Sequence, residues 1–274
     1  MIKLNGTLLL VGAGKMGGAM LSGWLENGLA PGQVLVQDPG PPPDIAAVLK
    51  DHAIAPASSF ETLAAGADVI VLAVKPQVMN HVLPSVVPHV APDTLVISVA
   101  AGTTVASLNK FLPRDTAIIR TMPNTPSAVG RGITGAFPTA PVTDPQRKLC
   151  DALLSAVGAV VWVENETQID AVTGVSGSGP AYVFHLVEAM ALAGMREGLS
   201  EAVAMQLARA TVEGAGELLF QSHETAATLR QNVTSPGGTT AAALNVLMDD
   251  ATGLPPLLAK AVHAARKRAE ELAG

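Results

Sequence analysis

Hydrophobic positions follow two different patterns in the two halves of the chain. In the first half, short runs rich in Val, Leu and Ile alternate with stretches of helical periodicity. We predict strands over Thr7–Val11, Val34–Gln37, Val69–Val74, Leu95–Val99, Ala117–Arg120 and Val160–Val163. Several of these runs are almost continuously apolar, as is typical of parallel strands covered on both faces. The alternation, with a helix over Lys15–Asn27, predicts a doubly wound α/β sheet of the Rossmann type.

Beyond about Glu164, long stretches rich in Ala, Leu, Met and Glu replace this alternation. We predict helices over Gln168–Val175, Gly179–Glu197, Ser200–Phe220, Glu224–Asn232, Thr239–Met248 and Leu254–Ala273. The sequence therefore predicts two domains, a dinucleotide-binding domain over residues 1–163 and an all-helical domain over residues 164–274.

Composition narrows the classes of protein that fit. Hydrophobic residues make up 49%, charged residues 15%, and the mean hydropathy is +0.37. No stretch offers the roughly 20 unbroken apolar residues of a membrane-spanning helix, so we expect no membrane partner and an apolar subunit interface instead. A net charge of −6 and 3% aromatic residues argue against nucleic-acid binding. The single Cys150 and the absence of a secretory signal at the N-terminus indicate a cytoplasmic protein.

A glycine-rich motif follows the first predicted strand and opens the first predicted helix. It reads Gly12-Ala13-Gly14-Lys15-Met16-Gly17. This context is the one that the dinucleotide-binding fingerprint requires, because the turn brings backbone amides and a helix start to a pyrophosphate. We interpret Gly12 to Met16 as cofactor-binding.

Asp38 ends the second predicted strand. An acidic residue here typically accepts bonds from the adenosine ribose and repels a 2′-phosphate, which favours NADH over NADPH. An ordinary turn aspartate before a proline fits the sequence equally well. Later strands end at Ala73, Val74, Lys75 and Pro76 and at Ala100 and Ala101, and we predict cofactor contacts there. A solvated loop lysine also fits Lys75, and a structural role in the turn fits Pro76. Ser59 and Asn124 are further predicted cofactor residues.

In the helical half, the segment Asn232–Thr240 ends one helix and starts another near Thr239. A helix start that carries Gly and Thr offers free amides and hydroxyls to a carboxylate, although a capped loop would have the same sequence. Other chemistries find little support. The six histidines do not form a metal-binding pattern, so we expect no metal, and Cys150 is interpreted as a buried small residue.

Taken together, the segments GAGKMG, AVKPQ, SVAAG, RTMPNTP, DAVTGVSGSGPAY and VTSPGGTT resemble those of the pyrroline-5-carboxylate reductase family. The resemblance runs from residue 12 to residue 240. It implies a Rossmann domain and a helical domain that forms an interlocked homodimer. It also implies that dimers assemble into rings, such as a decamer built from five dimers. It also implies substrate contacts at Glu166, Asn232, Ser235, Gly238, Thr239 and Thr240. The family's second strand often ends in a small hydroxyl residue that suits NADPH, and Asp38 departs from that pattern.

The activity that the resemblance implies is hydride transfer from NADH or NADPH to a small cyclic imino acid, giving L-proline in the last step of proline biosynthesis. In this hypothesis Thr240 bonds the ring nitrogen and the amides around Gly238 hold the carboxylate. Two alternatives are a β-hydroxyacid dehydrogenase and a non-catalytic, nucleotide-binding redox sensor. The first normally carries a catalytic lysine, and no lysine occurs between Glu164 and Ala259.

Overall fold

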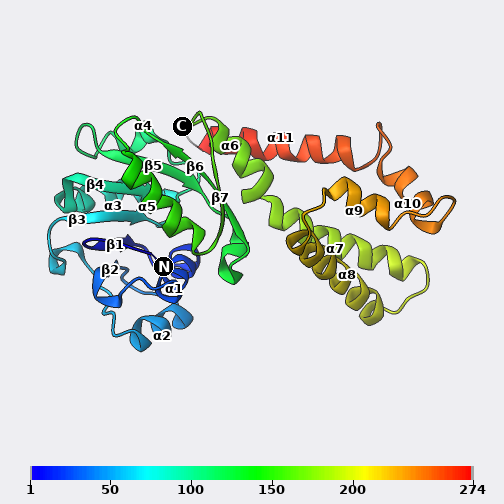
Figure 1. The fold of residues 1–274 in the computed structure, drawn as a ribbon, viewed down its shortest axis with the longest axis horizontal. Helices are drawn as coiled ribbons and strands as arrows, with labels where there is room; N and C mark the ends of the chain where they lie inside the picture. The colour runs from blue at the N-terminus through cyan, green and yellow to red at the C-terminus, as the bar shows by residue number, and fades with distance from the viewer. Residues whose placement is uncertain (1, 273–274) are drawn as a thin grey trace. The chain divides into compact units, whose positions relative to one another are not determined.

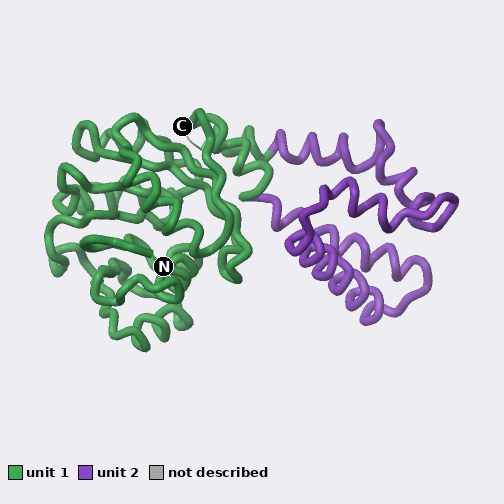
Figure 2. The backbone as a smooth tube through the Cα atoms, in the orientation of Figure 1, with its two compact units in different colours: residues 1–177, 265–274 green, residues 178–264 purple. Residues whose placement is uncertain are grey.

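The computed structural model describes residues 2–272, which divide into two compact units. Unit 1 comprises residues 1–177 and 265–274, and unit 2 comprises residues 178–264 (Figure 2). The positions of the two units relative to one another are not determined, so each is described by itself.

Unit 1 is built on a seven-stranded sheet with the order β2-β1-β3-β4-β5-β6-β7. The strands are β1 (Leu8–Val11), β2 (Val34–Gln37), β3 (Ala67–Leu72), β4 (Val90–Ser98), β5 (Ala117–Met122), β6 (Gly132–Pro138) and β7 (Gly158–Trp162). The helices are α1 (Lys15–Glu26), α2 (Pro43–Asp51), α3 (Pro76–Val86), α4 (Val105–Leu108), α5 (Asp144–Ser155) and α6 (Gln168–Val172). The first five strands are parallel, as predicted for a Rossmann-type sheet (Figure 1).

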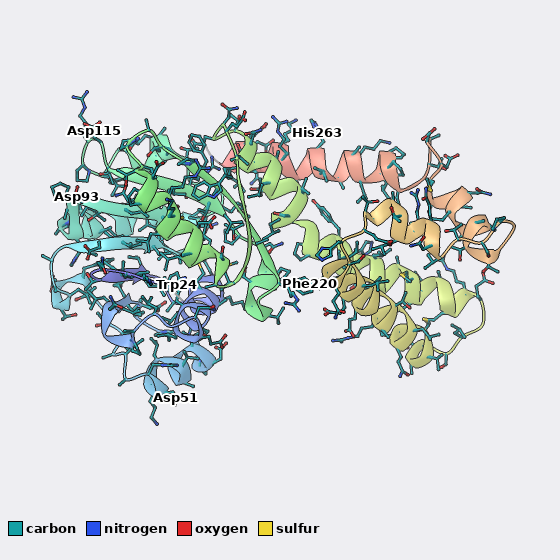
Figure 3. The ribbon with its side chains drawn as sticks, viewed as in Figure 1. Trp24, Asp51, Asp93, Asp115, Phe220 and His263 are labelled. Atoms are coloured by element: carbon teal, nitrogen blue, oxygen red, sulfur yellow. The ribbon has the colours of Figure 1, made fainter. Side chains whose placement is uncertain are left out.

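Alternate residues of each central strand enter two separate cores. In β1, Leu8 and Leu10 pack in one core and Leu9 and Val11 in the other. Helices α1, α2 and α5 cover the first core, and α3 and α4 cover the second. Trp24 is fully buried on α1 and donates its indole N–H to the carbonyl of Leu153 at 2.8 Å, which fastens α1 to α5 (Figure 3). Burial on both faces explains why these strands are continuously apolar.

The structure adds elements that the sequence pattern did not predict. Strand β6 pairs antiparallel with β5, and β7 then pairs parallel with β6. Helices α2 and α3, which the sequence pattern also did not predict, begin at Pro43 and Pro76. Proline suits the first helical turn because the amide that it lacks has no partner there.

Unit 2 is all helical, as predicted. Its helices are α7 (Gly179–Arg196), α8 (Glu201–Gln221), α9 (Ala226–Asn232), α10 (Thr239–Leu247) and the first part of α11 (Leu254–Leu272). Helices α7 and α8 pack closely through the small side chains Ala191, Ala204 and Ala208. Many large apolar side chains on these helices are exposed, among them Phe184, Leu207, Leu218, Phe220, Val246 and Leu257. Apolar surface of this extent marks an interaction surface.

No helix within residues 2–272 is long and apolar enough to cross a membrane.

Candidate active site

The glycine-rich turn between β1 and α1 is shaped by steric needs that differ from glycine to glycine. Gly12 has φ +91°, and a Cβ there would lie 2.9 Å from Val74 Cγ1 and 3.0 Å from the Ala73 carbonyl. A Cβ at Gly17 would lie 2.1 Å from the Gly12 carbonyl oxygen. A Cβ at Gly14 would meet no atom within 4 Å. Packing within the protein therefore requires glycine at positions 12 and 17. Position 14 faces open space, through which a ligand can come close to the backbone.

Helix α1 begins at Lys15, and its N-cap residue is Gly14. Glycine has no side chain that could accept hydrogen bonds from the first amides of the helix. Amides at an uncapped helix start are donors for an anion such as a pyrophosphate. The turn can therefore hold the phosphates of a dinucleotide through Gly12 to Met16, as the motif predicts.

Asp38 is tied to the glycine-rich turn. Its Oδ2 accepts from the amide of Ala13 at 2.7 Å, and its Oδ1 accepts from the amide of Gly40 at 2.8 Å. The second bond is that of a turn aspartate, one of the two interpretations that the sequence left open. The first bond, between residues 25 apart in sequence, fixes the end of β2 against the turn.

A cavity of about 810 Å³ lies beside this contact. Four of the predicted cofactor residues line it, namely Gly12, Asp38, Ser59 and Val74. It also includes side chains that the sequence analysis did not name, such as Pro39 and Val78. Its size suits part of a dinucleotide, since ligand pockets commonly measure ~300–1,000 Å³.

The other predicted cofactor residues occupy neighbouring turns of unit 1. Lys75 is the exposed N-cap of α3, and Pro76 is the first residue of that helix. Ala100 is buried and Ala101 exposed in the turn after β4. Asn124 follows β5, where its Oδ1 accepts from the amide of Ile133 at 2.9 Å. All three places lie where parallel strands end, the edge at which open α/β sheets bind ligands.

Arg120 corrects one sequence prediction. We predicted a strand over Ala117–Arg120, but β5 runs to Met122 and Arg120 lies buried within it. Its Nη1 donates to Glu166 Oε1 at 3.0 Å, and its Nη2 donates to Asp170 Oδ1 at 2.9 Å. The sequence did contain a sign of this cluster, because Arg120 is a charged residue inside an apolar run. A buried charge of this kind requires a partner of opposite charge.

Glu166, a predicted substrate residue, belongs to unit 1. Its Oε1 accepts from the amide of Val105 at 2.8 Å as well as from Arg120. It also lines a cavity of about 550 Å³ together with Pro76 and Gly102.

The remaining predicted substrate residues lie in unit 2, on one loop and the helix that follows it. Helix α10 begins at Thr239, as predicted, and its N-cap Gly238 has no side-chain cap. The loop is closed by the amide of Gly238, which donates to the Ser235 carbonyl at 3.0 Å, and Gly237 adopts φ +70°. Thr240 is half-buried in the first turn of α10. This arrangement offers uncapped amides beside two hydroxyls.

Asn232 has a partner that the sequence analysis missed. Its Nδ2 donates to Glu224 Oε2 at 3.0 Å, which joins the last residue of α9 to the segment just before that helix. The spacing of eight residues gives no recognisable pattern, so only the structure identifies this pair.

Cys150 is fully buried, and burial raises the pKa of its thiol well above the usual range, with a smaller contribution from Asp151. A thiol that stays protonated is a poor nucleophile. Among residues 2–272, no group of three or more His, Cys, Asp or Glu side chains could hold a metal ion.

Comparisons with known proteins agree with this geometry. Residues 166–272 match the family model for pyrroline-5-carboxylate reductase dimerisation, and residues 7–102 match that for NADP oxidoreductase, coenzyme F420-dependent. The chain is 40% identical over 266 residues to pyrroline-5-carboxylate reductase of Pseudomonas aeruginosa, with 97% of this chain and 96% of the relative covered. It is 39% identical to the Escherichia coli enzyme of that name, covering 86% and 88%.

Two solved structures are similar over almost the whole chain. One is a pyrroline-5-carboxylate reductase from Coxiella burnetii, with a TM-score of 0.90, 36% identity and coverage of 99% and 100%. The other is pyrroline carboxylate reductase from Plasmodium falciparum with NADP bound, with a TM-score of 0.80, 28% identity and coverage of 98% and 99%.

Proposed function

Because the chain belongs to the pyrroline-5-carboxylate reductase family, we propose that it reduces 1-pyrroline-5-carboxylate to L-proline, the last step of proline biosynthesis. The observation that carries the proposal is the full-length similarity to reductases of this name, joined to a glycine-rich turn shaped for a dinucleotide. The reaction adds a hydride to the imine carbon and a proton to the ring nitrogen. A reduced nicotinamide dinucleotide supplies the hydride when bound.

We assign dinucleotide binding to residues 1–163. The amides of Gly14, Lys15 and Met16 would hold the phosphates, and Gly12 and Ala13, whose amides donate to Gln37 and Asp38, would form the turn beside them. The adenosine end would lie against Asp38, Ser59, Val74 and the neighbouring Ala73. The turns that carry Lys75, Pro76, Ala100, Ala101 and Asn124 would flank the nicotinamide end. The open space at Gly14 and the cavity beside Asp38 support this assignment.

We assign dimerisation and substrate binding to residues 164–274. The free amides in the first turn of α10, beginning with that of Thr239, would hold the substrate carboxylate beside Gly238, with Ser235 closing the loop around it. Thr240 would bond the ring nitrogen, orienting the imine or relaying a proton from water. Asn232, held by Glu224, and Glu166 complete the proposed contacts.

The family's dimerisation model and the exposed apolar side chains of unit 2 support a homo-oligomer. We propose that this oligomer is built from interlocked homodimers. A ring of five such dimers would form a decamer. We also propose that the enzyme is cytoplasmic, in line with its single, buried thiol.

For the cofactor we propose a preference for NADH. The carboxylate of Asp38 would repel a 2′-phosphate, and no Lys or Arg occurs between Pro39 and Leu49 to offset that repulsion. One uncompensated charge contact of this kind is expected to disfavour NADPH by about tenfold or more in kcat/KM.

The test is the loss of nicotinamide absorbance when 1-pyrroline-5-carboxylate is added with NADH or with NADPH. We expect turnover with both cofactors and a higher kcat/KM with NADH. Asp38→Asn should reduce the NADH preference, because it removes the charge but keeps an oxygen acceptor. No turnover with either cofactor would contradict the proposed reaction, whereas a clear NADPH preference would contradict only the role of Asp38.

A further inference from the structure

The cluster formed by Arg120, Glu166 and Asp170 has no part in the proposed function beyond the substrate contact of Glu166. Arg120 has 2% of its side chain exposed, against 28% for Glu166 and 10% for Asp170. Two carboxylates thus share one buried guanidinium, and all three residues belong to unit 1. Such a cluster requires an explanation, because taking charges out of water is costly.

Stability does not supply that explanation. The Nε of Arg120 is buried and has no hydrogen-bond partner among the described residues. A buried donor without a partner lowers stability, and well-packed apolar side chains often replace buried ion clusters without loss. The cluster is better suited to fixing positions, since a guanidinium is a rigid planar fork.

The positions that it fixes lie on both sides of one turn. Glu166 Oε1 accepts from Arg120 on β5 and also from the amide of Val105, the first residue of α4. On the other side, Thr121 Oγ1 donates to the carbonyl of Ser98, the last residue of β4, at 2.9 Å. Residues 99–104 form the turn between Ser98 and Val105, and both its ends are therefore tied to neighbouring residues of β5.

This turn carries Ala100 and Ala101, which the proposed function places beside the nicotinamide. Gly102, with φ +69°, bends the chain immediately after them. If the bond between Arg120 and Glu166 is lost, the carboxylate that accepts from the amide of Val105 is no longer held by β5, and the turn loses its link to that strand. A shift of about 1 Å in a surface that orients a reactant can cost ~100-fold in rate.

We propose that Arg120 is a positioning residue for hydride transfer. It holds the turn of residues 99–104 in register with the end of β5 by way of the shared oxygen of Glu166. The inference rests on the proposed function, because the turn matters only if the nicotinamide lies against it. Arg120 itself touches neither cofactor nor substrate in this account.

Arg120→Lys keeps the charge but cannot bond both carboxylates from one planar group. We expect kcat to fall about 10- to 100-fold while the dissociation constant of the dinucleotide changes less than about threefold. The matched control is Arg114→Lys, since Arg114 is exposed just before the opposite end of β5. It should keep wild-type kcat.

The decisive readout is the deuterium isotope effect on kcat, measured with cofactor deuterated at C4 of the reduced ring. A misplaced turn slows the hydride step, so the isotope effect should rise in Arg120→Lys. A smaller folded fraction lowers the rate but leaves the isotope effect unchanged. An unchanged effect, or a kcat equal to that of Arg114→Lys, would overturn the inference.

A second pair of variants applies if Arg120→Lys does not fold. Asp170→Asn keeps an oxygen that accepts from Arg120 Nη2, whereas Asp170→Ala leaves that nitrogen without it. We expect Asp170→Ala to raise the isotope effect and Asp170→Asn to restore it toward wild type. Equal isotope effects in both would overturn the inference. A wild-type enzyme that does not reduce 1-pyrroline-5-carboxylate would instead remove the proposed function.

Discussion

At the scale of single residues, the chemistry of the proposed reaction depends on hydroxyl and amide groups rather than on strong acids. Thr240 lies in the first turn of α10, next to the uncapped amide of Thr239. A threonine hydroxyl is a weak acid, so we propose that Thr240 orients the imine or relays a proton from water. Donors placed in this way act by being fixed before the reaction begins.

We therefore predict that Thr240→Ala lowers kcat about 100-fold, because the ring nitrogen loses its fixed donor. Cofactor affinity, measured by fluorescence titration of NADH, should stay within about threefold of wild type, since the glycine-rich turn is untouched. Thr240→Ser retains the hydroxyl and should recover most of the rate. Wild-type turnover in Thr240→Ala would rule out this role.

At the scale of elements, the turn between β1 and α1 separates the steric demands of folding from those of binding. Gly17 is needed for packing, because a methyl group there would meet the Gly12 carbonyl oxygen at 2.1 Å. Gly14 has open space around its Cβ direction and φ −70°, a value that any residue adopts. Two glycines of one motif should therefore fail in different ways when a methyl group is added.

Gly14→Ala should fold as wild type does and bind dinucleotide at least about tenfold more weakly, because the methyl group occupies the approach of the pyrophosphate. Gly17→Ala should lower the free energy of unfolding by about 1–3 kcal/mol through overpacking. Thermal unfolding with and without NADH measures both effects. Unimpaired NADH binding by Gly14→Ala would argue against the proposed phosphate contact.

The elements predicted correctly from the sequence are those whose burial or whose ends require particular residue types. The central strands read as continuous apolar runs because both faces are covered, and α10 begins at Thr239, as its Gly and Thr residues indicate. Strand β6 was missed because its sequence, GITGAFP, contains two glycines and a proline. Its antiparallel pairing with β5 is a tertiary choice that local pattern does not encode.

In the candidate site, too, features set by local sequence were predicted and features set by tertiary structure were not. The glycine-rich turn was identified from its spacing and from its place between a predicted strand and a predicted helix, both of which are local features. The bond from Ala13 to Asp38 and the cluster around Arg120 join residues 25 to 50 positions apart. Only the sheet order brings such groups together, so sequence could indicate that Arg120 needed a partner but not which one.

At the scale of the whole molecule, the two units have distinct surfaces. Unit 1 buries its apolar residues in two cores on either side of a sheet, whereas the helices of unit 2 leave large apolar side chains exposed. The match to the dimerisation model over residues 166–272 explains that exposure, because a second copy of the chain is expected to cover it. The low share of charged residues, 15%, agrees with a chain that assembles.

The central claim is that this chain delivers a hydride to the imine carbon of 1-pyrroline-5-carboxylate. The most direct measurement uses NADH carrying deuterium at the transferred C4 position, followed by mass spectrometry and NMR of the product. We expect L-proline with one deuterium on Cδ, formed in equal amount to NAD⁺. Oxidation of NADH without labelled proline, or a label at another carbon, would contradict it.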